Sequence, residues 1–242
     1  MSLNLAMSKR TEAEIMSLMA KRPIRMTDDG CIMTGPVRLS FAALDKPAKP
    51  VEVGGKEKYQ ASLLFPHMNL TVLKDALLAK LKLDYPGLPD YSSFVNALSK
   101  NSPVKDQGMK INVKDGGYEP VKATVTGYTK GFMYVNPKSM RQPTLFHVVR
   151  GGWVAVLPEE ITKVMYSGCW VEAKIALIKS TANANPGEAT GLQGLWKLAD
   201  DNSFGGGSGA TAAEGGDVGD AFAAEDPNLI PNNDTAPAGD GW

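Results

Sequence analysis

Basic residues are missing from the last forty-three positions of this 242-residue chain. Residues 200–242 contain no lysine or arginine but nine carboxylates, so all twenty-six basic residues lie upstream, where they face seventeen acidic ones. The formally neutral chain therefore joins a body of net charge about +9 to a tail of about −9. Such an asymmetry favours a nucleic-acid partner, or a tail that shields a basic surface.

Cysteine and histidine are scarce, with two of each in the chain. Cys31 and Cys169 fit neither a disulfide framework nor a zinc-ligand spacing, which indicates a reducing compartment. His67 and His147 have no neighbouring cysteine or carboxylate at ligand spacing, so we expect no metal and no cofactor. No uncharged apolar run approaches the roughly 20 residues of a membrane helix, and residues 1–20 have no signal-peptide pattern. These absences predict a cytoplasmic protein.

Signatures of catalysis are also weak. The acidic pairs 28–29 and 159–160 resemble nuclease ligands, but adjacent carboxylates in a strand point to opposite sides of the sheet. The glycine pairs 54–55, 116–117 and 151–152 lack the lysine and the hydroxyl residue of a phosphate loop, and predict turns instead. We therefore expect a protein that is not an enzyme, with a nuclease as the weakest alternative.

Three segments follow from the pattern along the chain. In residues 1–23, Thr11 and Glu14 have the spacing of a capping box and begin a short helix that ends before Pro23, which we expect at the periphery. Residues 24–199 carry the periodic pattern of a folded domain. Residues 200–242 are rich in glycine, alanine and aspartate and cannot bury enough apolar surface to fold alone, so we expect a disordered acidic tail.

Most of the folded domain alternates apolar and polar residues, which is typical of half-buried strands. One helical insertion interrupts this pattern at residues 70–81 and 91–99. The expected strands cover residues 37–41, 58–65, 128–136, 145–157 with a fold at Gly151 and Gly152, 164–178 and 192–198. Many short strands with one inserted helical segment predict a mainly β protein, an OB-type Greek-key barrel, because closure removes exposed strand edges.

Two of the expected strands place aromatic and basic side chains on one face. In the first, residues 133 and 135 supply the core, and the opposite face carries Tyr128, Lys130, Phe132, Tyr134 and Asn136. In the second, the inward set is Cys169, Val171, Ala173, Ile175 and Leu177, and the opposite face carries Tyr166, Trp170, Glu172 and Lys174.

Such faces suit single-stranded nucleic acid, because unpaired bases stack on aromatic rings while lysine and arginine follow the phosphates. Lys138 and Arg141, in a loop bounded by Pro137 and Pro143, extend the first face at its edge. The alternative is that the aromatics are ordinary barrel packing and the loop charges are simply solvated.

Five stretches in sequence order resemble phage-encoded single-stranded DNA-binding proteins with an OB-fold. They are VRLSF at 37–41, KYQASLLFP at 58–66, GFMYVNPKSMRQP at 131–143, YSGCWVEAK at 166–174 and GLQGLWKL at 191–198. The resemblance spans about residues 24 to 204, and YSGCW is its most distinctive part. Residues 1–23 have no counterpart in it, and the tail is longer and richer in glycine than the family pattern.

The resemblance implies sequence-nonspecific binding of single-stranded DNA in phage replication or recombination, and an acidic carboxyl tail. Together with the two faces, it makes Tyr128, Lys130, Phe132, Tyr134, Lys138, Arg141, Trp170 and Lys174 the candidate DNA-binding residues. Asp240 and Trp242 of the tail are then candidates for docking on phage or host replication proteins, the alternative being a solubilising tail. The competing hypothesis for the whole chain is a protein-interaction or assembly module that does not bind DNA.

Overall fold

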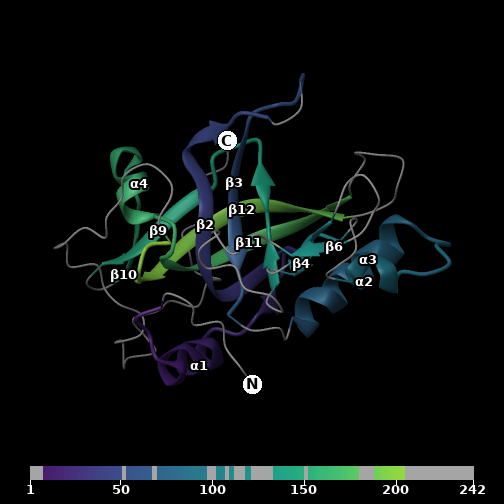
Figure 1. Ribbon diagram of the computed structural model, residues 1–242, viewed down its shortest axis with the longest axis horizontal. Coiled ribbons are helices and arrows are strands. Elements are labelled where there is room, and N and C mark those ends of the chain that lie inside the picture. Colours follow the sequence, from purple (N-terminus) through teal and green to yellow (C-terminus); the bar gives the residue numbers. More distant parts are fainter. Residues whose placement is uncertain are drawn as a thin grey trace.

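The computed structural model describes residues 8–50, 53–66, 70–96, 102–106, 109–111, 118–120, 133–149, 152–179 and 188–204 (Figure 1). The helices are α1 Glu12–Lys21, α2 Thr71–Asp84, α3 Ser92–Val95, the 3-10 turn η1 Pro158–Glu160, and α4 Ile161–Val164. The strands are β1 Arg25–Met26, β2 Ile32–Ala48, β3 Lys58–Leu64, β4 Val104–Asp106, β5 Met109–Ile111, β6 Tyr118–Pro120, β7 Met133–Val135, β8 Lys138–Ser139, β9 Thr144–Val149, β10 Gly152–Ala155, β11 Trp170–Lys179 and β12 Glu188–Ala199. Among these residues no helix is both long and apolar enough to cross a membrane.

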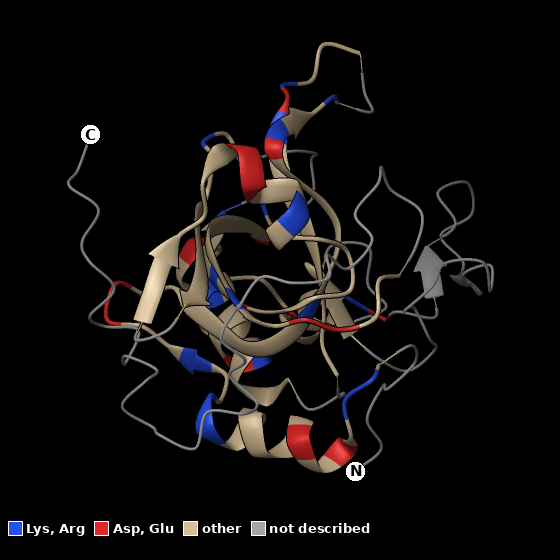
Figure 2. Cartoon of the chain, turned by 90° about the vertical axis from the view of Figure 1, so that its left-hand side faces the viewer, with Lys and Arg blue, Asp and Glu red and all other residues tan. Residues whose placement is uncertain are grey.

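Five strand positions close into a ring. The order around it is β2, β3, β8, β12, β11 and back to β2. All neighbours in the ring are antiparallel except β12, which pairs in parallel with β8 and then with β9. Figure 2 looks toward this ring from the side of Figure 1. This topology confirms the predicted OB-type Greek-key barrel, in which β7, β8 and β9 together supply the third strand position.

The barrel interior is filled by the alternate residues of the long strands. The predicted inward set of β11 and of Cys169 just before it belongs to the main core cluster, whereas Trp170 and Glu172 do not, which confirms the alternation, and Leu177 packs against the same core. The main members of this core from the other barrel strands are Ile32, Val37, Leu39, Ala61, Leu63, Val135, Leu145, Leu192 and Leu195. Each fully buried aliphatic side chain of this kind contributes roughly 1.5–3 kcal/mol of transfer free energy.

The helical insertion between β3 and β4 is confirmed. Leu73, Leu77 and Leu81 of α2 recur at helical spacing and are buried, and Leu70 just before the helix is buried with them. Figure 1 shows α2 and α3 together at one side of the barrel. The glycine-turned hairpin is confirmed as well, because β9 and β10 pair with Val149 opposite Gly152.

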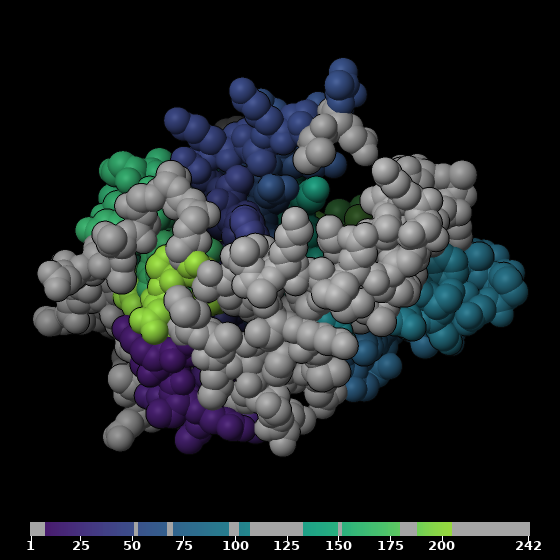
Figure 3. Space-filling model, in the orientation of Figure 1, coloured from purple at the N-terminus to yellow at the C-terminus, as the bar shows by residue number. Residues whose placement is uncertain are grey.

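Helix α1 is less peripheral than the sequence indicated. The Thr11 and Glu14 capping box is present as predicted. However, Ile15 and Leu18 are buried in a second apolar cluster with Trp170 and residues of β12. In Figure 3 the purple atoms of α1 lie directly against the yellow-green atoms near residue 200. The helix therefore covers the outer side of β11 and β12, because its apolar face finds partners there.

Candidate nucleic-acid interface

The second and third strands of an OB-type barrel present the outer face on which this fold usually binds oligonucleotides. Here the second strand is β3, and β7 with β8 forms the third. Ala61 and Leu63 of β3 point into the core, so strand alternation turns Lys58, Gln60 and Ser62 outward. We call the outward side of β3, β7 and β8 the β3–β8 face.

Tyr134 is the aromatic residue of the β3–β8 face. Its neighbours Met133 and Val135 are buried in the core, as predicted, and Tyr134 itself is only partly buried. Its backbone lies opposite Leu64 of β3 in antiparallel register. Alternation therefore puts Tyr134 on the outer side of the barrel with part of the residue exposed, the position from which a ring can stack on a base.

Polar groups continue this face beyond Tyr134. The Ser62 hydroxyl donates a hydrogen bond to Asn136 Oδ1 at 2.7 Å, which orients the amide on the exposed side of the strand. Lys138 lies opposite Gln60 and is exposed. A tyrosine of β7, the amide between the two strands and a lysine of β8 thus follow one another at alternate positions.

The loop after β8 is fastened to the neighbouring strand β2. The backbone N–H of Arg141 donates to Ser139 Oγ at 3.1 Å, and Gln142 Nε2 donates to the Leu44 carbonyl oxygen at 2.9 Å. The Arg141 side chain is exposed. Lys138 and Arg141 therefore lie at the edge of the β3–β8 face, and their contact with DNA stays a prediction.

A lysine-rich arm projects from the same side of the barrel. The ends of β2 and β3 form it, and we define the basic arm as residues 45–50 and 53–58. Four exposed lysines and two exposed carboxylates occur within those residues. They are Lys46, Lys49, Lys56, Lys58, Asp45 and Glu57. Figures 1 and 2 show the arm standing above the barrel, so it adds positive charge beside the face.

Phe41 is a candidate that the sequence did not reveal. Strand alternation over residues 37–41 puts Phe41 on the same side as Val37 and Leu39, which are buried, yet the Phe41 side chain is 57% exposed. The pairing of β2 with β3 shifts register between Ser40 and Ala43, and Phe41 has a φ of 43°. This β-bulge turns the ring outward beside β3, and bulges of this kind often re-aim a side chain for function. No glycine or asparagine in this stretch signals it.

Several candidates cannot be placed. Tyr128, Lys130 and Phe132, which precede β7, lie outside the described residues, as do Asp240 and Trp242 of the tail. Their roles remain those expected from the sequence.

Trp170 does not belong to an exposed face, which corrects the prediction. Its side chain is fully buried, and it packs with Ile15 and Leu18 of α1. The indole Nε1–H donates to Asp201 Oδ2 at 2.6 Å, and the Arg38 guanidinium lies 5.4 Å from the ring centroid. Strand alternation correctly puts Trp170 on the side of β11 that faces away from the barrel core, but α1 covers that side. The ring is therefore inaccessible to a DNA base.

The next two residues on the outer side of β11, Glu172 and Lys174, form ion pairs. Glu172 is fully buried between Arg22 and Arg25, with Arg25 Nη1 at 3.0 Å from its Oε1. Lys174 Nζ lies 2.6 Å from Asp29 Oδ2, and this hydrogen bond lowers the pKa of Asp29 to about 2. Lys174 is thus paired with Asp29 on the outer side of β11. Tyr134 lies on β7, so the structure does not bring these two candidate residues together.

Asp201 joins the amino-terminal segment to β11. The carboxylate, 1% exposed, accepts hydrogen bonds from Ser8 Oγ at 2.6 Å, the Lys9 N–H at 2.7 Å and Trp170. Arg38 Nη1 lies 3.4 Å from the same group. Burial alone would raise the pKa of Asp201, but Arg38 and the hydrogen bonds hold it below its usual value.

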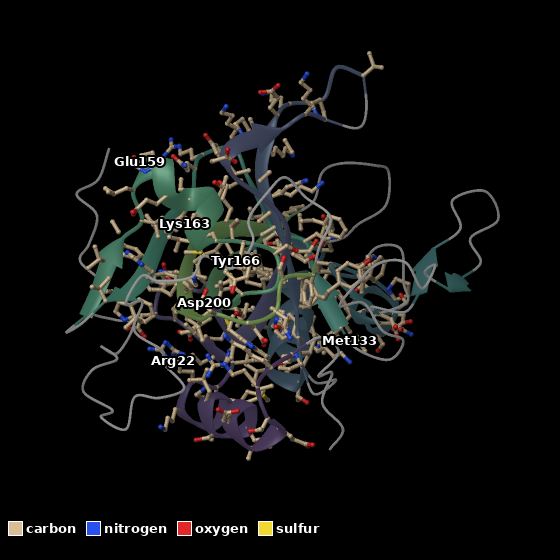
Figure 4. All side chains as sticks on the ribbon, turned by 60° about the vertical axis from the view of Figure 1, so that its left-hand side comes forward. Arg22, Met133, Glu159, Lys163, Tyr166 and Asp200 are labelled. Carbon is tan, nitrogen blue, oxygen red and sulfur yellow. The ribbon has the colours of Figure 1, made fainter. Side chains whose placement is uncertain are left out.

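The folded part of the chain extends beyond the predicted boundary at residue 199, so residues 200 and 201 do not belong to a separate tail. Asp200 Oδ1 pairs with Lys197 Nζ at 2.7 Å, and the Tyr166 hydroxyl donates to the Asp201 carbonyl oxygen at 2.8 Å. Figure 4 labels Tyr166 and Asp200 near the middle of the molecule, with Arg22 on the side of α1. The first two acidic residues of the segment satisfy buried partners and belong to the folded body.

Residues 202–204 cross the outer side of β2. Gly168 has a φ of 109°, and a Cβ there would lie 2.3 Å from the Asn202 carbonyl oxygen, so only glycine allows this close passage. Arg38 Nη2 donates to the same oxygen at 2.8 Å, and the Phe204 ring centroid lies 4.4 Å from the Arg38 guanidinium.

This crossing leaves the chain close to the β3–β8 face. Arg38 lies opposite Leu64, and Leu64 lies opposite Tyr134. Neighbouring strands are about 4.8 Å apart, so Phe204 stands about two strand spacings from the Tyr134 row. The described chain therefore reaches residue 204 beside the candidate surface.

Solved structures share this architecture. A barrel of this topology with an outward aromatic and basic face defines the class of OB-type nucleic-acid-binding proteins. The single-stranded DNA-binding protein from bacteriophage Enc34 in complex with ssDNA has a TM-score of 0.58 and 21% identity, over 76% of this chain and 94% of that chain. A second structure of the single-stranded DNA-binding protein from bacteriophage Enc34 has a TM-score of 0.56 and 19% identity, over 79% of this chain and 93% of that chain. At these identities the likeness shows the fold alone.

The family itself is established from sequence. Residues 31–226 match the family described as Enterobacter phage Enc34, ssDNA-binding protein, which is most of the chain. The chain belongs to this family. No curated protein matches it.

Proposed function

We propose that this protein binds single-stranded DNA during phage replication or recombination, in the host cytoplasm, without strong base preference and without covalent chemistry. Membership of the Enc34 ssDNA-binding family supports the substrate. The observation that carries the proposed site is the outward run of Tyr134, Asn136 and Lys138 on the strands where an OB-type barrel binds oligonucleotides.

Stacking and phosphate contact are the two interactions that this surface offers. A base on the Tyr134 ring gains about 1–3 kcal/mol and is accepted whatever its identity, because every base has a π-face. Phe41, exposed at the bulge of β2, offers a second ring. Lys138, Arg141 and the basic arm then follow the phosphates, which carry no sequence information.

Fluorescence anisotropy tests this proposal. The full chain is titrated into labelled single strands of mixed sequence and into the matching duplex, at several salt concentrations. We expect preference for the single strand and a log–log salt slope of about −0.7 per phosphate contact. The double variant Lys138→Ala, Arg141→Ala reduces the size of that slope by about 1.4 if both residues contact phosphates. Absence of binding to either DNA favours the protein-interaction or assembly module instead.

We propose further that the acidic residues after 204 compete with DNA for the basic surface. The support is their charge and the exit of the chain at Phe204, beside the β3–β8 face. A tethered segment reaches effective concentrations of about a millimolar, so even a weak contact counts. A chain ending at Phe204 should bind single strands more tightly, most of all at low salt. A chain that ends at residue 199 is unsuitable for this test, because it lacks Asp201 and the hydrogen bonds that Asp201 makes to Ser8, Lys9 and Trp170. Equal affinity of the full and shortened chains contradicts the competition.

Asp240 and Trp242 are proposed to dock on a phage or host replication protein. An acidic segment that carries an aromatic side chain next to a carboxylate suits a basic-rimmed pocket. The test is capture of the purified cognate polymerase or helicase by the full chain and by Trp242→Ala. Undiminished capture by the variant contradicts the docking, while DNA affinity serves as the internal control.

A further inference from the structure

Helix α2 has apolar residues on two sides. Leu73, Leu77 and Leu81 are buried on the side that faces the barrel. Val72 and Leu83 lie on a different side, where they are 42% and 75% exposed. Covering two such side chains would gain transfer free energy, so this second side of α2 is a candidate for contact with another molecule.

The second side of α2 lines an apolar groove. The groove has a volume of about 760 Å³ and lies between α2, the turn from β1 to β2, and β11. Met26, which is 49% exposed, and Leu177 contribute to the opposite wall. Figure 1 shows α2 at the right-hand edge of the molecule. Exposed apolar residues that share one hollow indicate an interaction site more strongly than the same residues scattered over the surface.

The spacing of the groove residues on α2 matches another helix. Val72, Ala76, Ala79 and Leu83 line the groove and follow one another at intervals of four, three and four positions. These intervals are those of the seam between two packed helices. The two alanines in the middle let a second helix approach closely, and the larger residues at the ends then pack around it. We call these four residues the α2 seam.

The charges beside the α2 seam indicate which helix it fits. Asp75 and Lys82 lie on the same flank, each one position before a seam residue, and both are exposed. Two copies of α2 related by a two-fold axis across the helices run antiparallel, with equal flanks side by side. Asp75 of each copy then lies beside Lys82 of the other. A parallel pair would instead bring Asp75 toward Lys80, which already pairs with Asp84 at 2.6 Å.

We propose that a second copy of this chain occupies the groove, with the two α2 helices packed antiparallel along the α2 seam. Val72 of one copy meets Leu83 of the other, and Ala76 meets Ala79. Because the contact uses the same surface on both copies, it closes after two chains and forms a dimer rather than a filament. The inference goes beyond the proposed DNA binding and does not rest on it.

Sedimentation equilibrium of the full chain through the micromolar range tests this proposal. We expect a reversible dimer. Ala79→Glu puts a charge in the middle of the apolar seam and should raise the dissociation constant of the dimer at least about a hundredfold. Ala13→Glu, at an exposed position of α1, is the matched control and should dimerise as the wild type does. Circular dichroism checks that each variant is folded.

Charge reversal tests the antiparallel direction. Asp75→Lys should weaken the dimer about tenfold, because the symmetry places two lysines side by side at both ends of the seam. Adding Lys82→Asp to the same chain restores opposite charges and should return the dissociation constant to within about twofold of the wild type. A double variant as weak as Asp75→Lys alone overturns the antiparallel pairing.

A zero-length carbodiimide crosslinker locates the interface directly. Chains with light and heavy nitrogen are mixed, so that mass spectrometry separates crosslinks between copies from those within one chain. We expect Asp75 of one copy joined to Lys82 of the other, and loss of this crosslink in Ala79→Glu. A full chain that stays monomeric, or a dimer that Ala79→Glu leaves intact, overturns the proposal. Crosslinks from Lys82 to carboxylates after residue 204 assign the groove to that segment and overturn it as well. In each case the proposed DNA binding is tested separately by anisotropy.

Discussion

Two outer faces of this barrel have similar residues and different surroundings. The outer side of β11 carries Trp170, Glu172 and Lys174, and the β3–β8 face carries Tyr134 and Lys138. The first is covered by α1 and closed by ion pairs to Arg22, Arg25 and Asp29, whereas the second is partly exposed. An aromatic and a lysine on one strand therefore do not define a binding surface until the covering segments are known.

The largest expected effect concerns stability on the β11 side. Trp170→Ala removes a buried indole and the hydrogen bond to Asp201, and should lower the free energy of unfolding by about 3–5 kcal/mol. Urea denaturation measures it, and Trp170→Phe is the control that keeps most of the ring volume. If Trp170→Ala leaves stability unchanged and weakens DNA binding, Trp170 is a DNA contact, and the outer side of β11 does not differ from the β3–β8 face as described.

On the β3–β8 face the effect should fall on binding. Tyr134→Ala should weaken binding to single strands by about 1–3 kcal/mol, because it removes the stacking ring. Tyr134→Phe keeps the ring and should bind almost as the wild type. The measurement is the dissociation constant at fixed salt, with the urea midpoint recorded alongside. If Tyr134→Ala and Tyr134→Phe bind alike, stacking at this position is wrong.

Phe41 tests whether the bulge belongs to the same surface. Phe41→Ala should weaken binding by about 1–2 kcal/mol if the ring stacks. Phe41→Gly removes the same ring but relieves the positive φ, at which a non-glycine residue costs roughly 1–2 kcal/mol. The two variants should therefore share one affinity and differ in unfolding free energy. Wild-type affinity in both removes Phe41 from the surface.

The smallest effect is expected at Lys174. Lys174→Ala should leave DNA affinity unchanged and cost under about 1 kcal/mol of stability, because its partner Asp29 is more than half exposed. The depressed pKa of Asp29 means that this contribution is present above about pH 4 and is lost as pH falls toward 2. Unfolding measured at pH 6 and at pH 2.5 should show the difference between variant and wild type shrinking. A clear loss of DNA affinity contradicts the separation of the two faces.

Local pattern was a good guide wherever neighbouring residues decide the structure. The capping box of α1, the leucines of α2 and the alternation in β3, β7 and β11 all follow from contacts within a few residues. The predicted strand from residue 164 instead begins at Trp170, because residues 161–164 form α4 and Gly168 makes room for Asn202. Asn202 is more than thirty residues away in sequence, so the local pattern contains no sign of this contact.

The site was harder to predict for the same reason. The exposure of Tyr134 follows from alternation, but the bulge at Phe41 depends on the register between β2 and β3. The burial of Trp170 depends on α1, which is separated from it by more than a hundred residues. Sequence periodicity assigns a residue to a side of a strand, and tertiary packing then decides what that side meets.

The carboxylate of Asp201 has a consequence for the order of events during protein synthesis. Its hydrogen bond to Ser8 spans 193 positions, and the partners of α1 include Leu198 and Ala199. After Ser8 and α1 have left the ribosome exit tunnel, nearly two hundred further residues must be synthesised before Asp201 leaves it too. At bacterial rates of synthesis this delay is about 10–40 seconds. During that delay the apolar side of α1 lacks its partners Leu198 and Ala199. Docking of this helix is therefore one of the last steps in the folding of the newly made chain.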